Sequence, residues 1–592
     1  MSAEKMELRD HPYTKRESNE NQCMKLLSTD ATFAPSSSFS DESLGSQVRN
    51  VERNDSQWSS STKVHTLSGL YSVVLSVFVG ISVFTELLHG PVPLFYIHVY
   101  LFLYLFGISI LLLCISFASW FKSKYLQTAE TTVKVQTCGY ALSAKGFCFG
   151  ITNLYLKLGI VVFGVGFFVS TCLEIAAIFT SSTQCMSVVS AIVPVFRCLF
   201  IILLTICLVS NPKELFGSYG CFRHLVVMHI TATVAAVWIQ IFLWESNKDW
   251  QDALHFKHNS SSLWEQNEIN ISVHSLDSDA NSMDMNKHLP LHTVHFTSNC
   301  WWRTSEYQEV IDTVAIQMCL LNSTVGNISE KAATFLYPFT SQYCFVVVCV
   351  LYLIWEESRP DTKKCSFTSY VPYDRDNNGI CNRSTKGLFC GFLILVSSII
   401  ITIMFLTSRN MNYIVLRSIY CIIFILSFCA SILGLTQVKR MSVSKCNCRT
   451  RFIKLFQTSG IISVYIYGSC NIIVGALSDD TISILISCEA ILMMLHASTQ
   501  YVFIFEVSRK RIDNSNMYVK PGRQVVFFLA FCNISLWLLD CFILWNHAKS
   551  DLQVKFYGNI AWPIMMRLVI PFLVYFRFYS ASVLLQAWIV SY

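Results

Sequence analysis

Three polar side chains lie along one apolar stretch in the later part of the chain, at the spacing of a helix. Glu489, His496 and Gln500 are separated by seven and four residues, which places all three on one helical face. In the next apolar stretch, Asn533 and Asp540 are seven residues apart and likewise share a face. Carboxylate, imidazole and amide groups in such a stripe can order water and pass a proton, because imidazole exchanges protons near neutral pH. The alternative is that these groups only hydrogen-bond neighbouring helices together.

The first half of the chain carries further ionisable side chains inside apolar stretches. These are Glu86, Glu174, Arg197, His229 and Glu245. Charged groups are costly in hydrocarbon, so each of them is a candidate for a water-lined or ion-lined path. Arg197 can instead pair with Glu174 or Glu86, which would neutralise both charges and serve structure alone. His229 is either a packed polar residue or a relay, and Glu245 is either a flanking charge or an external proton acceptor.

Two arginines lie in the last apolar stretch of the chain. Arg567 and Arg577 are costly there unless they are paired, and Asp540 is a candidate partner for either of them. Arg577 therefore joins the residues that we expect to line or gate a polar path.

Composition places the chain in a membrane. Of its 592 residues, 53% are hydrophobic and 14% are charged, and the mean hydropathy is +0.46. Soluble domains carry about a quarter charged residues, so this chain is far more apolar. The net charge of +6 comes mostly from Lys and Arg in loops, and we infer no nucleic-acid binding. The 24 cysteines lack the spacing of a zinc cluster, and no cofactor is predicted.

About twelve apolar stretches each approach the ~20 residues that an α-helix needs to cross a bilayer. They run approximately over residues 67–88, 94–117, 158–179, 188–209, 225–244, 335–355, 388–406, 414–435, 456–477, 482–505, 525–545 and 564–588. The sequence therefore predicts an all-α polytopic membrane protein.

The charges in the loops predict the orientation. Lys and Arg cluster after the second, eighth and tenth stretches, whereas the loops after the first, third and ninth stretches lack both. Because Lys and Arg concentrate in cytoplasmic loops, we expect both termini in the cytoplasm, with the chain in the plasma membrane. Residues 1–64 are rich in Ser, Asn and charged side chains and are expected to form a disordered cytosolic tail.

The longest loop, residues 246–333, is predicted to be external. It contains four N-x-[ST] sequences, which are acceptors for glycosylation at Asn259, Asn270, Asn322 and Asn327. The clustering of all four in the one long loop expected outside supports the orientation.

A sequence pattern recurs once. Pro338-Phe339 precedes Trp355, and Pro571-Phe572 precedes Trp588, with the proline seventeen residues before the tryptophan in both. The recurrence predicts two pseudo-repeated six-helix halves, residues 65–356 and 387–592, joined by a cytosolic linker at 357–386. Such repeats are common in transporters.

Several motifs are missing from the sequence. There is no G-x-x-x-x-G-K-[ST] loop for ATP, no H-E-x-x-H and no G-x-S-x-G, so no enzyme activity is predicted. The T-V-G-Y-G filter of potassium channels is also missing.

Short stretches in a fixed order resemble the otopetrin family. Those stretches include Leu156-Lys157-Leu158-Gly159, Phe163-Gly164-Val165-Gly166, Met228-His229, Glu245-Ser246, Leu336-Tyr337-Pro338-Phe339, Leu536-Trp537, Phe556-Tyr557-Gly558 and Arg577-Phe578. Each is weak alone, but their order across nearly all of the chain after the tail is specific.

The resemblance implies a proton-selective channel, activated by external acid, with twelve helices in two halves and assembled as a homodimer. In family members a Gln, an Asn or Asp, and a Tyr constrict each half. The second half of this chain keeps Gln500 and Asn533 but not the Tyr. The first half keeps Tyr343, with Leu204 and Val234 in the other two positions. These departures favour a path in the second half or between the halves.

Two other functions stay open from the sequence alone. Repeated halves are also found in secondary transporters of small solutes, which would show substrate-dependent uptake. The lost polar residues also allow a non-conducting scaffold derived from a channel.

Overall fold

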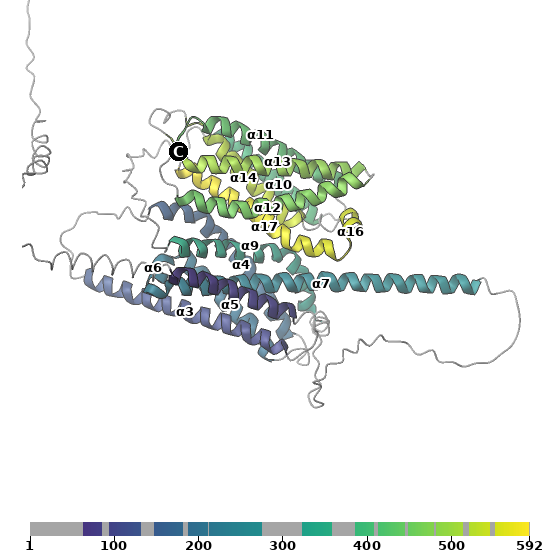
Figure 1. Cartoon of the computed structure of the whole chain (residues 1–592), viewed down its shortest axis with the longest axis horizontal. Helices are drawn as coiled ribbons and strands as arrows, with labels where there is room; N and C mark the ends of the chain where they lie inside the picture. Colours follow the sequence, from purple (N-terminus) through teal and green to yellow (C-terminus); the bar gives the residue numbers. More distant parts are fainter. Residues whose placement is uncertain are drawn as a thin grey trace, which may run out of the picture. The chain divides into compact units, whose positions relative to one another are not determined.

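The computed structural model describes residues 63–85, 94–131, 147–180, 188–210, 212–274, 323–357, 385–407, 413–443, 448–478, 481–512, 520–544 and 551–590. Twelve helices within these ranges are long and apolar enough to cross a membrane, which confirms the predicted all-α polytopic fold. The first of them, Lys63–Thr85, carries no label in Figure 1. The others are α3 (Leu94–Thr131), α4 (Phe147–Thr180), α5 (Val188–Val209), α7 (Arg223–His274), α9 (Thr324–Glu357), α10 (Thr385–Thr407), α11 (Tyr413–Val438), α12 (Cys448–Leu477), α13 (Thr481–Arg509), α14 (Arg523–Leu539) and α17 (Ala561–Val590).

Short elements connect these helices. A π-helical turn, η5 (Asp540–Leu544), directly follows α14. The remaining elements are α6 (Pro212–Gly217), η2 (Gly220–Phe222), α16 (Asp551–Tyr557) and the antiparallel pair β1 (Ser442–Val443) and β2 (Lys510–Arg511). The strand pair joins the ends of α11 and α13.

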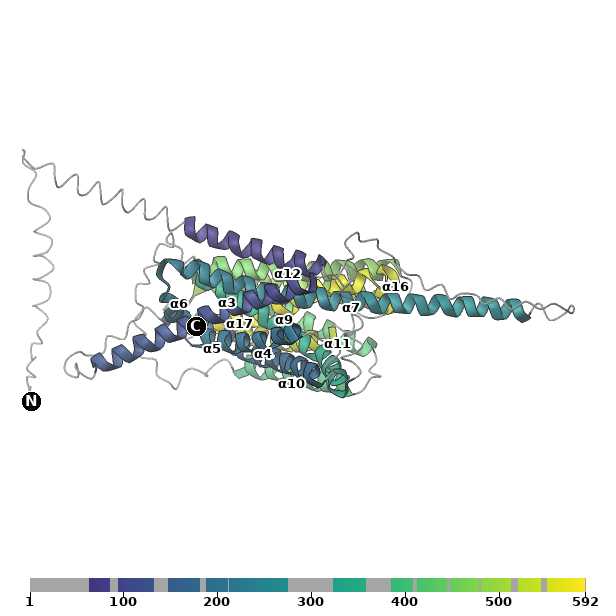
Figure 2. The ribbon, with the colours of Figure 1, turned by 90° about the horizontal axis from the view of Figure 1, so that it is seen from below.

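Helix α7 differs most from its prediction. It has 52 residues, roughly 78 Å at 1.5 Å per residue, and no Gly or Pro interrupts it. Both views show it continuing past the neighbouring helices (Figures 1 and 2). Because α9 begins at Thr324, both ends of the predicted external loop 246–333 are helical, and its external position stays a prediction. Most of the predicted tail 1–64 and linker 357–386 lies outside the described residues.

The contacts among the first six helices recur among the second six. In the first set, α4 packs against α5 and α9, α3 against α5 and α7, and α7 against α9. In the second set, α12 packs against α13 and α17, α11 against α13 and α14, and α14 against α17. This correspondence supports the predicted two halves, which Figure 1 shows on either side of α9 and α17.

The halves meet along α17, which contacts α4, α7 and α9. A glycine on α4 permits the close approach of α17, because a Cβ at Gly159 would overlap the ring of Phe578. Within the first half, a Cβ at Gly166 would lie 2.7 Å from the Cβ of Phe339 on α9. Between them, the Phe163 ring centroid lies 4.9 Å from that of Phe578. The junction at this level is therefore dry and tightly packed.

Candidate functional site

Five polar residues selected from the sequence are buried together in the second half. They come from α13, α14 and η5, and they are Glu489, His496, Gln500, Asn533 and Asp540. Helices α11 and α17 pack against the same group. The predicted shared faces therefore turn inward, away from lipid.

The innermost contact is a pair of amides. The Nε2 of Gln500 donates to Oδ1 of Asn533 at 2.9 Å, and Nδ2 of Asn533 donates back to Oε1 of Gln500 at 3.0 Å. Both side chains are fully buried. The pair ties α13 to α14 and narrows the second half at this point.

Glu489 forms an ion pair that the sequence analysis missed. Its Oε2 lies 2.5 Å from Nη1 of Arg417 on α11, and both side chains are buried. The Arg417 guanidinium also contacts the hydroxyl of Tyr413 and lies over its ring. An arginine inside the apolar stretch 414–435 was the available signal. Glu489 is therefore neutralised by a partner, which favours the structural interpretation of this residue.

The polar atoms of Asp540, Arg577 and His496 are much less well hydrogen-bonded than those of Glu489. The Nε of Arg577 lies 3.5 Å from Oδ2 of Asp540, too far for a good hydrogen bond. Neither ring nitrogen of His496, and none of the guanidinium nitrogens of Arg577, has a hydrogen-bond partner among the described residues. His496 and Arg577 are fully buried, and Asp540 is only 3% exposed. Of the two arginines considered as partners for Asp540, the structure selects Arg577.

Aromatic rings enclose this group. The Arg577 guanidinium lies 5.4 Å from the ring centroid of Phe424 and 5.5 Å from that of Phe576. The His496 ring lies 5.7 Å from the ring of Phe424, centroid to centroid. A charged group held between ring faces gains some cation–π stabilisation, but the rings satisfy none of its N–H groups.

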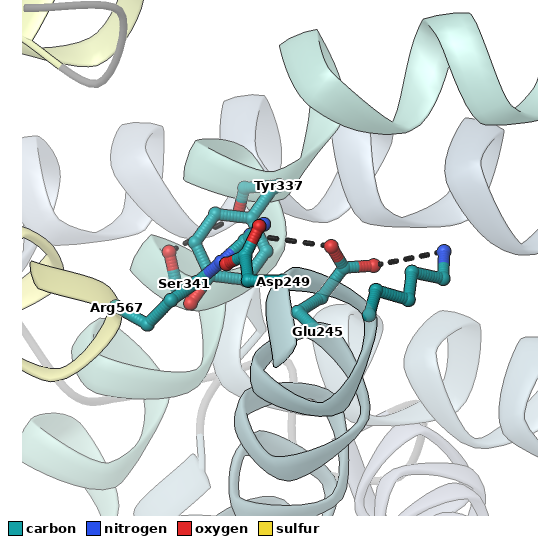
Figure 3. A network of polar contacts seen from close by, with 6 residues as sticks. Glu245, Asp249, Tyr337, Ser341 and Arg567 are labelled. Carbon is teal, nitrogen blue, oxygen red and sulfur yellow. Dashed lines mark hydrogen bonds and ion pairs between the residues drawn. The ribbon is translucent and has the colours of Figure 1, made fainter. Parts of the chain in front are cut away.

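A second polar cluster lies between the halves. Nε and Nη2 of Arg567 donate to the two carboxylate oxygens of Asp249 at 2.6 and 3.1 Å. Nη1 of Arg567 lies 3.2 Å from Glu245, whose other oxygen lies 3.3 Å from Lys248. Figure 3 shows both carboxylates reaching from α7 toward Arg567, with Tyr337 beside them. Glu245 is thus held by two cations, so it is not the isolated proton acceptor considered from the sequence.

A cavity adjoins this cluster. It is lined by Glu245, Ala333, Thr334, Tyr337, Pro338, Ser341, Gln342, Asp540, Cys541, Arg567, Ile570, Pro571 and Val574. The space open to water centres is about 60 Å³, which at about 15 Å³ each is room for roughly four waters. The lining comes from both halves and includes Asp540.

The first half contains better satisfied polar groups. Nη1 of Arg197 donates to Glu174 at 2.8 Å, so one of its two predicted pairings is present. The hydroxyl of Tyr343 and that of Thr205 are 3.0 Å apart. Around Tyr343, Leu204 and Val234 are buried in the hydrophobic core.

His229 is buried in the first half. The Tyr71 hydroxyl lies 2.9 Å from its Nδ1. Glu86 lies outside the described residues. Among the described residues, no group of three or more His, Cys, Asp or Glu side chains is placed to hold a metal ion.

Sequence reasoning missed several partners. Arg417 neutralises Glu489, and Asp249 binds Arg567. Gln342 links the two halves by donating to the carbonyl of Pro571 at 3.0 Å. Asp249 lay beyond the end of the fifth apolar stretch and was therefore assigned to a loop. Only the unexpected length of α7 brings it to α17.

Twelve apolar helices in two contacting sets, with buried titratable groups and a polar cavity between them, define a polytopic membrane protein with the interior of a channel or transporter. The family model described as otopetrin matches residues 155–578, and the chain belongs to the otopetrin family.

Two curated relatives are named as proton channels. The chain is similar to the proton channel OtopLc of Drosophila melanogaster, at 24% identity over 460 residues that cover 74% of this chain and 27% of the relative. This chain therefore spans about a quarter of the length of that relative. It is also similar to the human proton channel OTOP2, at 20% identity over 508 residues that cover 74% of this chain and 82% of the relative.

Proposed function

We propose that the chain conducts protons down their gradient across a membrane, and that the second half carries the path. The observation that supports this most is the set of buried polar atoms on His496, Arg577 and Asp540 that have no hydrogen-bond partner among the described residues. Leaving such atoms dry costs about 1–3 kcal/mol each, and more for charged groups. Water would remove this cost, and a hydrated imidazole and carboxylate can exchange protons.

Direct side-chain contact inside the second half favours protons over metal cations. Gln500 and Asn533 are hydrogen-bonded to each other and fully buried, and the Phe576 ring is fully buried as well. A hydrated Na⁺ needs a pore wide enough for its waters, whereas a proton moves by exchange along hydrogen bonds. The first half offers fewer polar groups for a proton path, because Leu204 and Val234 occupy its core.

Further properties belong to the same proposal. The printed names of the relatives support proton flux, and the proposal adds that external acid activates the current. The chain would lie in the plasma membrane with both termini in the cytoplasm, carry glycans at the predicted acceptors Asn259, Asn270, Asn322 and Asn327, and assemble as a homodimer.

Whole-cell recording under an external acid step tests the proposal. The reversal potential should follow the proton gradient by about 59 mV per pH unit. It should not change when external Na⁺ is replaced by a large organic cation. A reversal potential that ignores pH would contradict proton conduction. Uptake that depends on a small solute would instead support a secondary transporter.

A further inference from the structure

We propose that protons reach the second half sideways, from the cavity between the two halves, and that Asp540 passes them from this cavity toward the imidazole of His496, with Arg577 as a fixed positive charge beside the path. The inference rests on the proposed function and adds the access route and the residue at its inner end. A route along the axis of the second half would instead begin beside the Glu489–Arg417 pair, which is buried and neutralised.

Asp540 is the structural link between two polar regions. It lines the cavity between the halves, and its Oδ2 lies 3.5 Å from the Nε of Arg577. Arg577 and His496 both lie against the Phe424 ring, at 5.4 and 5.7 Å from its centroid. A carboxylate that lines a cavity with room for water and also contacts the buried group is placed to accept protons from the cavity and donate them to that group.

The backbone at Asp540 is unusual. Helix α14 ends at Leu539, and residues Asp540–Leu544 form a π-helical turn. Such turns shift the side chains that follow relative to a regular α-helix, and they occur often at functional sites. Here the turn begins at the residue that joins the cavity to the buried group.

A proline inside each of two helices helps to explain why the cavity is polar and open. Pro338 of α9 and Pro571 of α17 both line it, as do Thr334 and Arg567, which are four residues earlier on the same helices. A proline has no N–H to give to the carbonyl four residues before it, and its ring pushes that carbonyl aside. Each helix therefore lacks one regular backbone hydrogen bond where it lines the cavity.

The charged cluster at the other end of the cavity stabilises its walls. Arg567 is bound by Asp249 through two hydrogen bonds and is paired with Glu245, which fixes α17 against α7 (Figure 3). Because the charge of Arg567 is offset by two carboxylates, the cluster presents no net positive barrier to an incoming proton. By the predicted orientation, this end of the cavity faces outward.

A bulky side chain in the cavity tests the access route, and the chain offers a matched control. Ala332 and Ala333 are adjacent and both half-buried, but only Ala333 lines the cavity. We expect Ala333→Trp to reduce the acid-evoked proton current at least tenfold at equal surface density. Ala332→Trp should stay within twofold of the unmodified chain.

A second variant covers the case in which Ala333→Trp does not reach the surface. Thr334 lines the cavity and is exposed, so Thr334→Trp adds bulk at the rim without displacing the core, and it should reduce the current similarly. Current in either cavity variant equal to that of Ala332→Trp, at equal surface density, would overturn the sideways route while leaving proton conduction intact. An unmodified chain without any proton current would contradict the proposed function itself, and this inference with it.

Discussion

The ion pair of Glu489 and Arg417 gives the sharpest test of which buried groups are structural. Glu489→Gln would leave the Arg417 guanidinium buried with only Tyr413 as a partner. Removing one member of a buried pair destabilises a protein by about 3–5 kcal/mol, because the other charge is left uncompensated. We expect the single variant to show a lower melting temperature, poor surface delivery and therefore little current.

The double variant separates stability from conduction. In Glu489→Gln with Arg417→Gln, both charges are gone, so neither residue leaves an uncompensated charge in the core. Neutral replacements of buried pairs often cost little, so the free energy of unfolding should return to within about 1–2 kcal/mol of the original. Current per channel at the surface should return with it.

The assay combines thermal unfolding of the purified protein in detergent with proton current normalised to surface labelling. The coupling between the two substitutions should be large, because the two residues are in direct contact. A double variant that is stable and delivered but carries no current would refute the reasoning. Glu489 would then be part of the proton path.

Two further substitutions distinguish the halves. Asn533→Leu should lower the free energy of unfolding by about 2–4 kcal/mol, because it leaves the buried amide of Gln500 without its donor and acceptor, and an unchanged melting temperature would show that water replaces the pair. Tyr71→Phe removes the hydroxyl that contacts His229 and interacts with Tyr104, and it should cost about 0.5–1.5 kcal/mol with unchanged current. Loss of current in normally delivered Tyr71→Phe would move the path into the first half.

Much of the fold followed from the sequence, because bilayer thickness sets helix length. Each of the twelve predicted stretches overlaps one observed helix. The exception is the far end of α7, where a polar sequence continues as helix with no Gly or Pro to stop it. Hydropathy marks where a helix enters lipid, not where it ends in water.

The candidate site was only partly predictable. Spacing along α13 and α14 identified Glu489, His496, Gln500, Asn533 and Asp540 as facing inward, and all five are buried. Spacing says which residues share a face but nothing about which helix lies opposite. That is why the partner of Glu489 was missed, and why Arg567 was considered for Asp540 although it binds Asp249.

The cavity between the halves was beyond the reach of the sequence. The paired prolines were visible as a repeat, but their common position against one cavity depends on how α9 and α17 pack. Similarly, the π-helical turn at Asp540 has no sequence signal, since no Gly or Pro marks it.

The most direct test of a hydrated proton path is the proton current of His496→Leu. Neither ring nitrogen of His496 bonds another described side chain or backbone group, so leucine breaks no such contact and should leave melting temperature and surface delivery unchanged. We predict that the acid-evoked current per surface channel falls at least tenfold. A His496→Leu protein with full current would contradict the account, because His496 would then be packing alone.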